Sequence, residues 1–188
     1  MDVVLVQNTV AAIVCYPVGS PAFVVGAGAG VVVIPRSQPG ASVDFDPASD
    51  GVALPGDVVI DADDVVVFGR GPGRTIVAGN VVVHGSGVEL RALTVTGSVQ
   101  LTGAAPVAVL LDVFGSMTVS GDDAILAGNL VFGDLDVQGG RALLVDDGIQ
   151  GLFTLGGASP ECQGNYAFAD NGDRVVADDE VTAAYACP

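Results

Sequence analysis

The chain of 188 residues is half apolar and strongly acidic: 22 Asp and Glu residues stand against six arginines and no lysine, for a formal net charge of −16. Nucleic-acid binding and anionic-membrane binding both need basic patches, so this charge argues against both functions. The length fits one domain, and no run of about 18 uninterrupted apolar residues predicts a transmembrane helix. The charge suits cation binding, a saline environment or solubility through self-repulsion.

The N-terminal third precedes the regular part of the sequence. Residues 1–36 are apolar and strand-like, whereas residues 37–56 are rich in Ser, Pro, Gly and Asp and predict a loop. The first apolar stretch has no basic start and is interrupted by Pro and Gly, so it does not resemble a signal peptide. We expect residues 1–55 to form an N-terminal cap or cover.

Glycine then recurs every 18 residues in two registers. The two series are Gly79, Gly97, Gly115, Gly133 and Gly151, and Gly85, Gly103, Gly121, Gly139 and Gly157. A fixed period of this kind is typical of a solenoid, with one repeat to each coil. We therefore expect an all-β fold in which residues 56–169 form a single-stranded right-handed parallel β-helix, with glycine at sharp turns or positive φ.

The regular rungs of this helix are expected at 80–97, 98–115, 116–133 and 134–151, with a decaying fifth rung at 152–169. Ahead of them we expect an irregular first coil, because the apolar segment at 64–69 resembles the segment at 80–85 but precedes it by only 16 residues.

Alternation along each rung predicts which side chains face the interior. In the first strand these are Val81, Val83, Val99, Leu101, Met117, Val119, Leu135, Val137, Phe153 and Leu155; in the closing strand they are Val95, Val113, Val131, Ile149 and Ala167. Two residues before the closing positions, the column Leu93, Leu111, Asn129, Asp147 and Asn165 turns polar. Polar side chains stacked at an inward corner predict hydrogen bonds to the turn backbone and to one another.

Three stretches carry a family resemblance: Gly56-Asp57-Val58-Val59-Ile60-Asp61, residues 65–77 and residues 87–97. They resemble the coils of right-handed parallel β-helix proteins, the pectate-lyase-like group, over residues 56 to about 168. That group includes lyases, hydrolases, adhesins and inert scaffolds, so the resemblance implies a fold more than a function. A left-handed hexapeptide helix is the alternative, but the glycines divide each rung into 6 and 12 residues.

The short, gapless rungs also look like those of bactofilins, which are cytoskeletal β-helices that polymerise end to end. A pair of cysteines, an acidic tail and the irregular first coil depart from the bactofilin pattern.

The acidic candidates for catalysis are Asp112, Asp122, Asp123, Asp136, Asp146 and Asp147. A glycoside hydrolase needs two carboxylates that face each other, and a pectate-lyase-type enzyme needs acidic calcium ligands facing a base. On the rung template the candidates fall on different faces, and Asp123 aligns with Arg141 as a cross-rung ion pair. The lone His84 is expected to be a solvated turn residue. We therefore expect no enzymatic activity.

The tail at 170–188 resembles an EF-hand or dockerin calcium loop, and its candidate ligands are Asp170, Asn171, Asp173, Asp178 and Glu180. Ala169 at the first ligand position and Arg174 at the turn depart from that pattern, so a solvated acidic loop is the alternative. Cys162 and Cys187 flank the tail, and a disulfide between them would imply an oxidising compartment. Reduced thiols in the cytoplasm are the other possibility.

An apolar column is expected on the outer side of the closing strand, made of Phe114, Leu130, Phe132, Tyr166 and Phe168. Such a surface needs an explanation. Three explanations are open: residues 1–36 fold over it, a second subunit covers it in a homo-oligomer, or sugar rings dock on it.

Taken together, the sequence predicts a non-catalytic structural β-solenoid, extracellular or on the cell surface, with self-assembly into filaments or a layer as a further expectation. The alternatives are a polysaccharide-binding or polysaccharide-cleaving protein and a cytoplasmic scaffold. No cofactor is expected apart from calcium.

Overall fold

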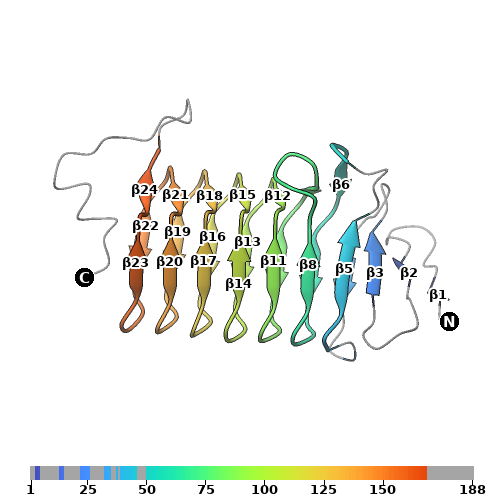
Figure 1. Cartoon of the computed structure of the whole chain (residues 1–188), viewed down its shortest axis with the longest axis horizontal. Helices are drawn as coiled ribbons and strands as arrows, with labels where there is room; N and C mark the ends of the chain where they lie inside the picture. Colours follow the sequence, from blue (N-terminus) through green and yellow to red (C-terminus); the bar gives the residue numbers. More distant parts are fainter. Residues whose placement is uncertain are drawn as a thin grey trace.

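The computed structural model describes residues 50–168, residues 37 and 39–45, and four short strands further upstream. Its described regular structure is all β, and most of it forms one stack of coils with three parallel strands to each coil (Figure 1). In Figure 1 the chain rises along the near sheet, descends along the far one and advances from right to left. This is a right-handed coil, as expected.

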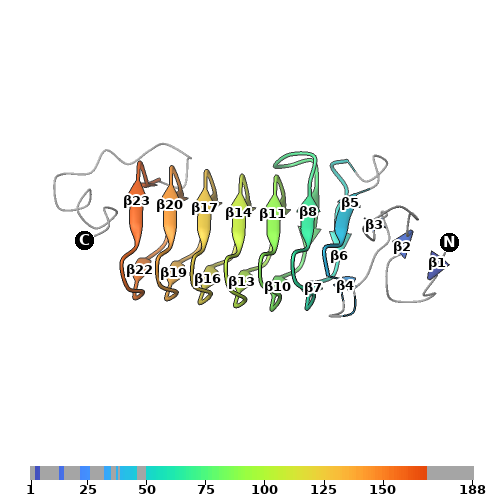
Figure 2. The same ribbon diagram turned by 60° about the horizontal axis from the view of Figure 1, so that its bottom comes forward.

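Strands at equivalent places in successive rungs form three sheets, which Figure 2 shows from below. The first sheet contains β4 (Val32–Ile34), β7 (Val58–Ile60), β10 (Val81–Val83), β13 (Val99–Leu101), β16 (Met117–Val119), β19 (Leu135–Val137) and β22 (Phe153–Leu155). The second sheet contains β3 (Ala22–Val25), β5 (Ser42–Phe45), β8 (Val66–Phe68), β11 (Glu89–Arg91), β14 (Val107–Val109), β17 (Ile125–Ala127), β20 (Leu143–Val145) and β23 (Glu161–Gln163). The third sheet contains β6 (Ala53–Pro55), β9 (Ile76–Ala78), β12 (Thr94–Val95), β15 (Asp112–Val113), β18 (Leu130–Val131), β21 (Gly148–Ile149) and β24 (Tyr166–Ala167). A separate antiparallel pair, β1 (Val3–Val4) and β2 (Ile13–Val14), lies upstream.

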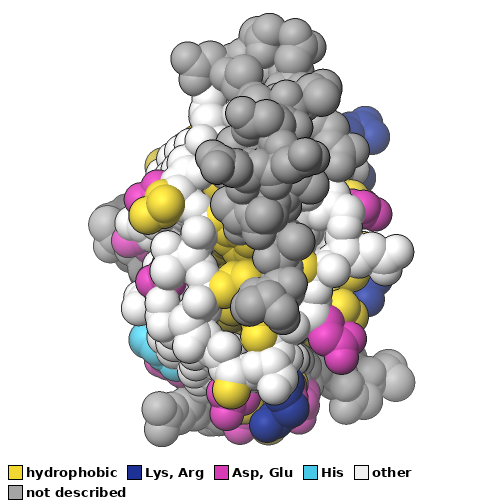
Figure 3. All heavy atoms as spheres, turned by 90° about the vertical axis from the view of Figure 1, so that its left-hand side faces the viewer, with side chains coloured by type: hydrophobic (Ala, Val, Ile, Leu, Met, Phe, Trp, Pro, Cys, Tyr) yellow, Lys and Arg dark blue, Asp and Glu magenta, His cyan; other side chains and the backbone are white. Residues whose placement is uncertain are grey.

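The core is a column of aliphatic side chains along the coil axis, and hydrophobic side chains show in yellow at the middle of the end-on view in Figure 3. The inward positions predicted for the first and closing strands are buried from Val81 to Ile149, while Phe153, Leu155 and Ala167 in the last rung are half-buried. The strand of the second sheet adds a third inward column that the sequence pattern did not distinguish: Val67, Leu90, Ala108, Leu126 and Leu144. Each of these stacked side chains contributes roughly 1.5–3 kcal/mol when fully buried.

The sheets begin earlier than residue 56, where the sequence pattern placed the first coil. Strands β3 and β4 pair with β5 and β7, and the predicted loop at 37–56 contains β5 and β6, which continue the second and third sheets. The four-residue alternation of Ser42–Phe45 places Val43 in the core. This short alternating pattern did not predict a strand, because the surrounding Pro and Gly residues favour a loop.

The 16-residue spacing of the first coil is wrong. Val81 pairs with Val58 instead of Val65, so this rung is 23 residues long. The hydrogen bond between Asp57 and Asn80 spans the same 23 residues, whereas the equivalent bond between Asn80 and Ser98 spans 18. The five additional residues form the loop between β8 and β9, which projects beyond its neighbours in Figure 1. Because residues 58–60 and 65–67 are both apolar triplets, composition alone did not distinguish the two registers.

The two glycine columns exist because successive rungs approach closely, which corrects the expected role of positive φ. None of their ten members has positive φ. A Cβ built on Gly103 would lie 1.9 Å from the carbonyl oxygen of Gly85, and one on Gly121 would lie 1.8 Å from that of Gly103. The positive φ values fall on neighbouring corner positions, including the non-glycine residues Ala105 and Asp123.

Replacing a glycine of these columns should break the contact between two rungs. We expect Gly103→Ala to lower the free energy of unfolding by at least about 2 kcal/mol, because backbone atoms have to move to admit the methyl group. Gly73→Ala is the control: that position has positive φ, but nothing lies within 4 Å of an added Cβ, so the expected cost is about 1 kcal/mol. Urea unfolding of both variants checks this, and equal losses would contradict the close-approach explanation.

Candidate functional site

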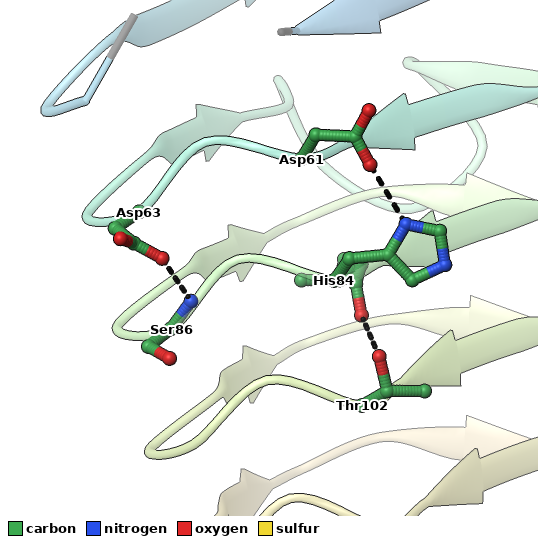
Figure 4. Close-up of polar contacts among 6 residues, drawn as sticks. Asp61, Asp63, His84, Ser86 and Thr102 are labelled. Carbon is green, nitrogen blue, oxygen red and sulfur yellow. Dashed lines mark hydrogen bonds and ion pairs between the residues drawn. The ribbon is translucent and has the colours of Figure 1, made fainter. Parts of the chain in front are cut away.

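The single histidine of the chain lies at the corner where β10 ends, and Figure 4 shows it turned toward Asp61 of the preceding rung. The Nδ1 atom of His84 is 2.7 Å from the Asp61 Oδ1 atom. A carboxylate at this nitrogen fixes the ring orientation and leaves Nε2 facing away from the pair. The sequence pattern missed this partner because a 16-residue spacing places Phe68, instead of Asp61, next to His84.

A catalytic His–Asp pair needs a third group to activate. The hydroxyl next along the same column belongs to Thr102, and it donates to the carbonyl oxygen of Val83 at 3.0 Å (Figure 4). On the adjoining turn, Asp63 accepts the backbone N–H of Ser86 at 2.8 Å. The polar groups at this corner are therefore bonded to groups of the adjacent rung, and they join coils together.

The six acidic candidates do not converge in space. Asp112 lies on β15 in the third sheet and Asp136 on β19 in the first. Asp122 and Asp123 follow β16, and Asp146 and Asp147 follow β20 at a different corner. Among the residues that the structure describes, no group of three or more His, Cys, Asp or Glu side chains is placed to hold a metal ion.

The cross-rung ion pair predicted from the sequence is confirmed. The Nε and Nη2 atoms of Arg141 each lie 2.6 Å from an oxygen of Asp123, which makes a bidentate contact one rung apart. The hydrogen bond from Arg141 lowers the pKa of the Asp123 carboxyl group. Both residues are exposed and have positive φ. The pair joins neighbouring turns.

The polar corner column forms the predicted ladder. The Asn129 amide nitrogen donates to Asp147 Oδ1 at 2.8 Å and to the Ala108 carbonyl at 3.0 Å, while its oxygen accepts the Leu111 N–H. The Asp147 N–H donates in turn to Asn165 Oδ1 at 2.9 Å. Asn129 and Asp147 are fully buried, so these bonds replace the water that the side chains lose.

Asp147 is the exception in this ladder, because its Oδ2 atom is buried without a hydrogen-bond partner. Asn129 and Asn165 both donate their amide nitrogen to the carbonyl 21 residues earlier, and the equivalent carbonyl for Asp147 is that of Leu126. A carboxylate has no proton to offer there, whereas a neutral carboxyl group does. Burial raises the pKa of Asp147 to about 6, against the lowering effect of the bonds from Asn129.

The aromatic column is aligned as predicted. The rings of Phe114 and Phe132 are parallel, with centroids 4.6 Å apart, and Phe168 meets Phe132 edge-on at 5.1 Å. Phe114 is 54% exposed, whereas Phe168 is buried; Leu130 and Tyr166 are half-buried. The described strands β3 and β4 of the N-terminal segment pair with β5 and β7, so they do not cover this column.

The predicted calcium ligands Asp170, Asn171, Asp173, Asp178 and Glu180 lie outside the described residues, and so does Cys187. Cys162 lies on β23 and is disulfide-bonded, but its pairing with Cys187 stays a prediction. No helix among the described residues is long and apolar enough to span a membrane.

Comparison with protein-family models, with curated proteins and with solved structures finds no match for this chain. The parallel β-helix is therefore shown by the structure itself. The resemblances to the pectate-lyase-like group and to bactofilins stay resemblances of the sequence pattern.

Asp147 should make stability depend on pH. Its folded pKa of about 6 exceeds the value of about 3.9 expected in the unfolded chain, so the folded state holds the proton more tightly. This contribution is fully present below about pH 4 and is lost as pH rises through about 6, with a total of about 3 kcal/mol. Asp147→Asn should therefore be more stable than the parent at pH 7.5, and its advantage should shrink toward pH 4.5.

Urea unfolding of Asp147→Asn and of the control Asp136→Asn, an outward-facing position on β19, measures this across pH. An advantage of Asp147→Asn that does not change with pH would contradict the neutral carboxyl group in the ladder.

Proposed function

We propose that this chain is a non-catalytic structural module, a rigid β-solenoid that serves as a building block outside the cell or on its surface. The observation that carries the proposal is the unbroken rung-to-rung bonding of the three parallel sheets between residues 50 and 168. Each rung is bonded to the next along three sides, so bending would break many backbone hydrogen bonds together. Such a stack suits a load-bearing or spacing element.

The use of the reactive side chains also favours this role. His84 with Asp61, Arg141 with Asp123, and Asp147 with Asn129 each form a contact between one rung and the next. An enzyme on this fold needs such groups to face a common substrate. Here they are distributed over different corners of the coil and strengthen it.

The extracellular location rests on composition and on sulfur chemistry. The chain has 22 acidic residues and no lysine, a balance that keeps a protein soluble in a saline environment. A disulfide at Cys162 is typical of an oxidising compartment. In this proposal the Cys162–Cys187 bridge anchors the acidic tail, which calcium orders when its candidate ligands bind the ion.

A second candidate, polysaccharide binding, is favoured by one observation, the stacked and partly exposed rings of Phe114 and Phe132. Because the two rings stack face to face, an apolar sugar face would contact the exposed ring edges and the outer face of Phe114.

If the role is structural, the purified chain should form rod-shaped particles and should not cleave polysaccharides. In negative-stain images the purified chain should form straight particles, alone or joined into longer filaments. Incubated with acidic polysaccharides, with and without calcium, it should release unsaturated products only at the background rate. Asp112→Asn, Asp136→Asn and Arg141→Gln should leave that rate unchanged; turnover above background that one of these changes abolishes would overturn the proposal.

The polysaccharide candidate predicts loss of glycan retention when the aromatic column is removed. On a glycan array or an affinity gel, the double variant Phe114→Ala/Phe132→Ala should lose about tenfold or more in affinity if sugars stack on these rings. Leu110→Ala is the matched control, since Leu110 is 52% exposed but lies at another corner and is not aromatic. If the parent chain binds no glycan, this second candidate is eliminated.

A further inference from the structure

The outward face of the second sheet is apolar in the middle of the coil. Each strand of this sheet presents two outward side chains around one inward side chain. On β14, β17 and β20 these outward residues are Val107, Val109, Ile125, Ala127, Leu143 and Val145. The strands of the first sheet in the same region present Gln100, Thr118 and Asp136. The two sheets therefore face different surroundings.

No described element covers this face. In Figure 1 the strands β8, β11, β14, β17, β20 and β23 lie at the front, and no other described strand lies over them. Ile125 is 40% exposed and Phe68, at the N-terminal end of the same face, is 44% exposed. A contiguous apolar surface on a chain of charge −16 marks an interaction site.

The outward residues form two columns, and the columns differ in charge and size. The first column contains Val66, Glu89, Val107, Ile125, Leu143 and Glu161, and the second contains Phe68, Arg91, Val109, Ala127, Val145 and Gln163. At the second rung of each column a negative residue stands beside a positive one, and Glu89 and Arg91 form an ion pair within the chain. At β17 a large residue stands beside a small one. The columns continue onto β5, where Asp44 follows Phe68. The charged residues of this face, Asp44, Glu89, Arg91 and Glu161, all lie outside the three central rungs β14, β17 and β20, whose outward residues carry no charge.

We propose that this face binds the same face of a second copy of the chain, with the two coils side by side and parallel. A two-fold axis that runs along the coil direction between two such faces places the first column of one copy against the second column of the other, rung by rung. Glu89 then meets Arg91 twice, and Ile125 meets Ala127 twice. This arrangement therefore places opposite charges together and packs a large side chain against a small one.

The other face-to-face arrangement is less favourable. A two-fold axis parallel to the strands and centred on β17 pairs each column with itself and reverses the order of the rungs. Glu89 of one copy then meets Glu161 of the other, which places like charges together. A basic or acidic partner of another kind has few charged groups to bind on this patch, whereas a second copy matches both its charges and its apolar rows.

This inference deepens the proposed structural role, because it names the partner and the surface of self-assembly. Sedimentation velocity of the full chain should show a concentration-dependent dimer. Ile125→Asp should weaken dimerisation about tenfold or more, since it places a charge in the centre of the contact. Thr118→Asp makes the same change in charge on the first sheet and should leave the dissociation constant within about twofold of the parent value. Unchanged melting temperatures would show that both variants fold.

A charge-reversal pair gives the sharpest test. Glu89→Arg alone and Arg91→Glu alone should each weaken dimerisation, because like charges then face each other across the axis. A mixture of the two variants should form a heterodimer, since two positive residues on one copy then meet two negative ones on the other. A parent chain that stays monomeric, an unaffected Ile125→Asp variant, or a mixture that does not associate would overturn the inference.

These outcomes are separable from the proposed function. A strict monomer that forms single rods without turnover removes the lateral dimer and leaves the structural role intact. Turnover of a polysaccharide removes the structural role whatever the state of association.

Discussion

The close approach of successive backbones is the constraint on which this fold depends. Glycine at two corners of each regular rung between residues 80 and 151 lets the carbonyl oxygen of one coil lie where a Cβ would otherwise be. Strands can then hydrogen-bond from rung to rung on all three sheets, and aliphatic side chains stack over one another inside. The corner ladders of His84, Asn129 and Arg141 depend on the same spacing, because their partners lie one rung away.

Strict repetition made much of the fold predictable from the sequence. A constant 18-residue interval defines the rungs from 80 to 151, and alternation within them identifies the buried positions. The prediction failed where the interval changes. An insertion after β8 shifted the first coil, so Val58 was not recognised as the partner of Val81, and Asp61 was not placed beside His84. The middle strand was missed because its outward residues in the central rungs, such as Val107 and Val109 around the inward Ala108, are as apolar as the inward one, so no alternation marks it.

The polar side chains show why the acidic composition alone could not define a site. Asp123 and Asp147 belong to the same residue type and follow the same repeat, yet one pairs with an arginine in solvent and the other is buried in a ladder of amides. Their pKa values shift in opposite directions for that reason. A sequence column indicates that equivalent residues stack, but only the corner geometry decides whether water reaches them.

The loop between β8 and β9 shows how the coil accommodates additional length. Five extra residues leave the solenoid there and return without disturbing the register of β9 with β12. Nothing lies within 4 Å of a Cβ built on Gly73, and the Gly73 N–H donates to Thr94 Oγ1 at 2.7 Å, which ties the loop to the next rung. The exposed residue Pro72 of this loop is therefore a natural graft point, and a foreign peptide inserted there would be displayed sideways from a stiff rod at a known height. Equivalent corners on later rungs offer the same opportunity at intervals of about 4.8 Å, so the molecule can act as a ruler for spacing displayed epitopes.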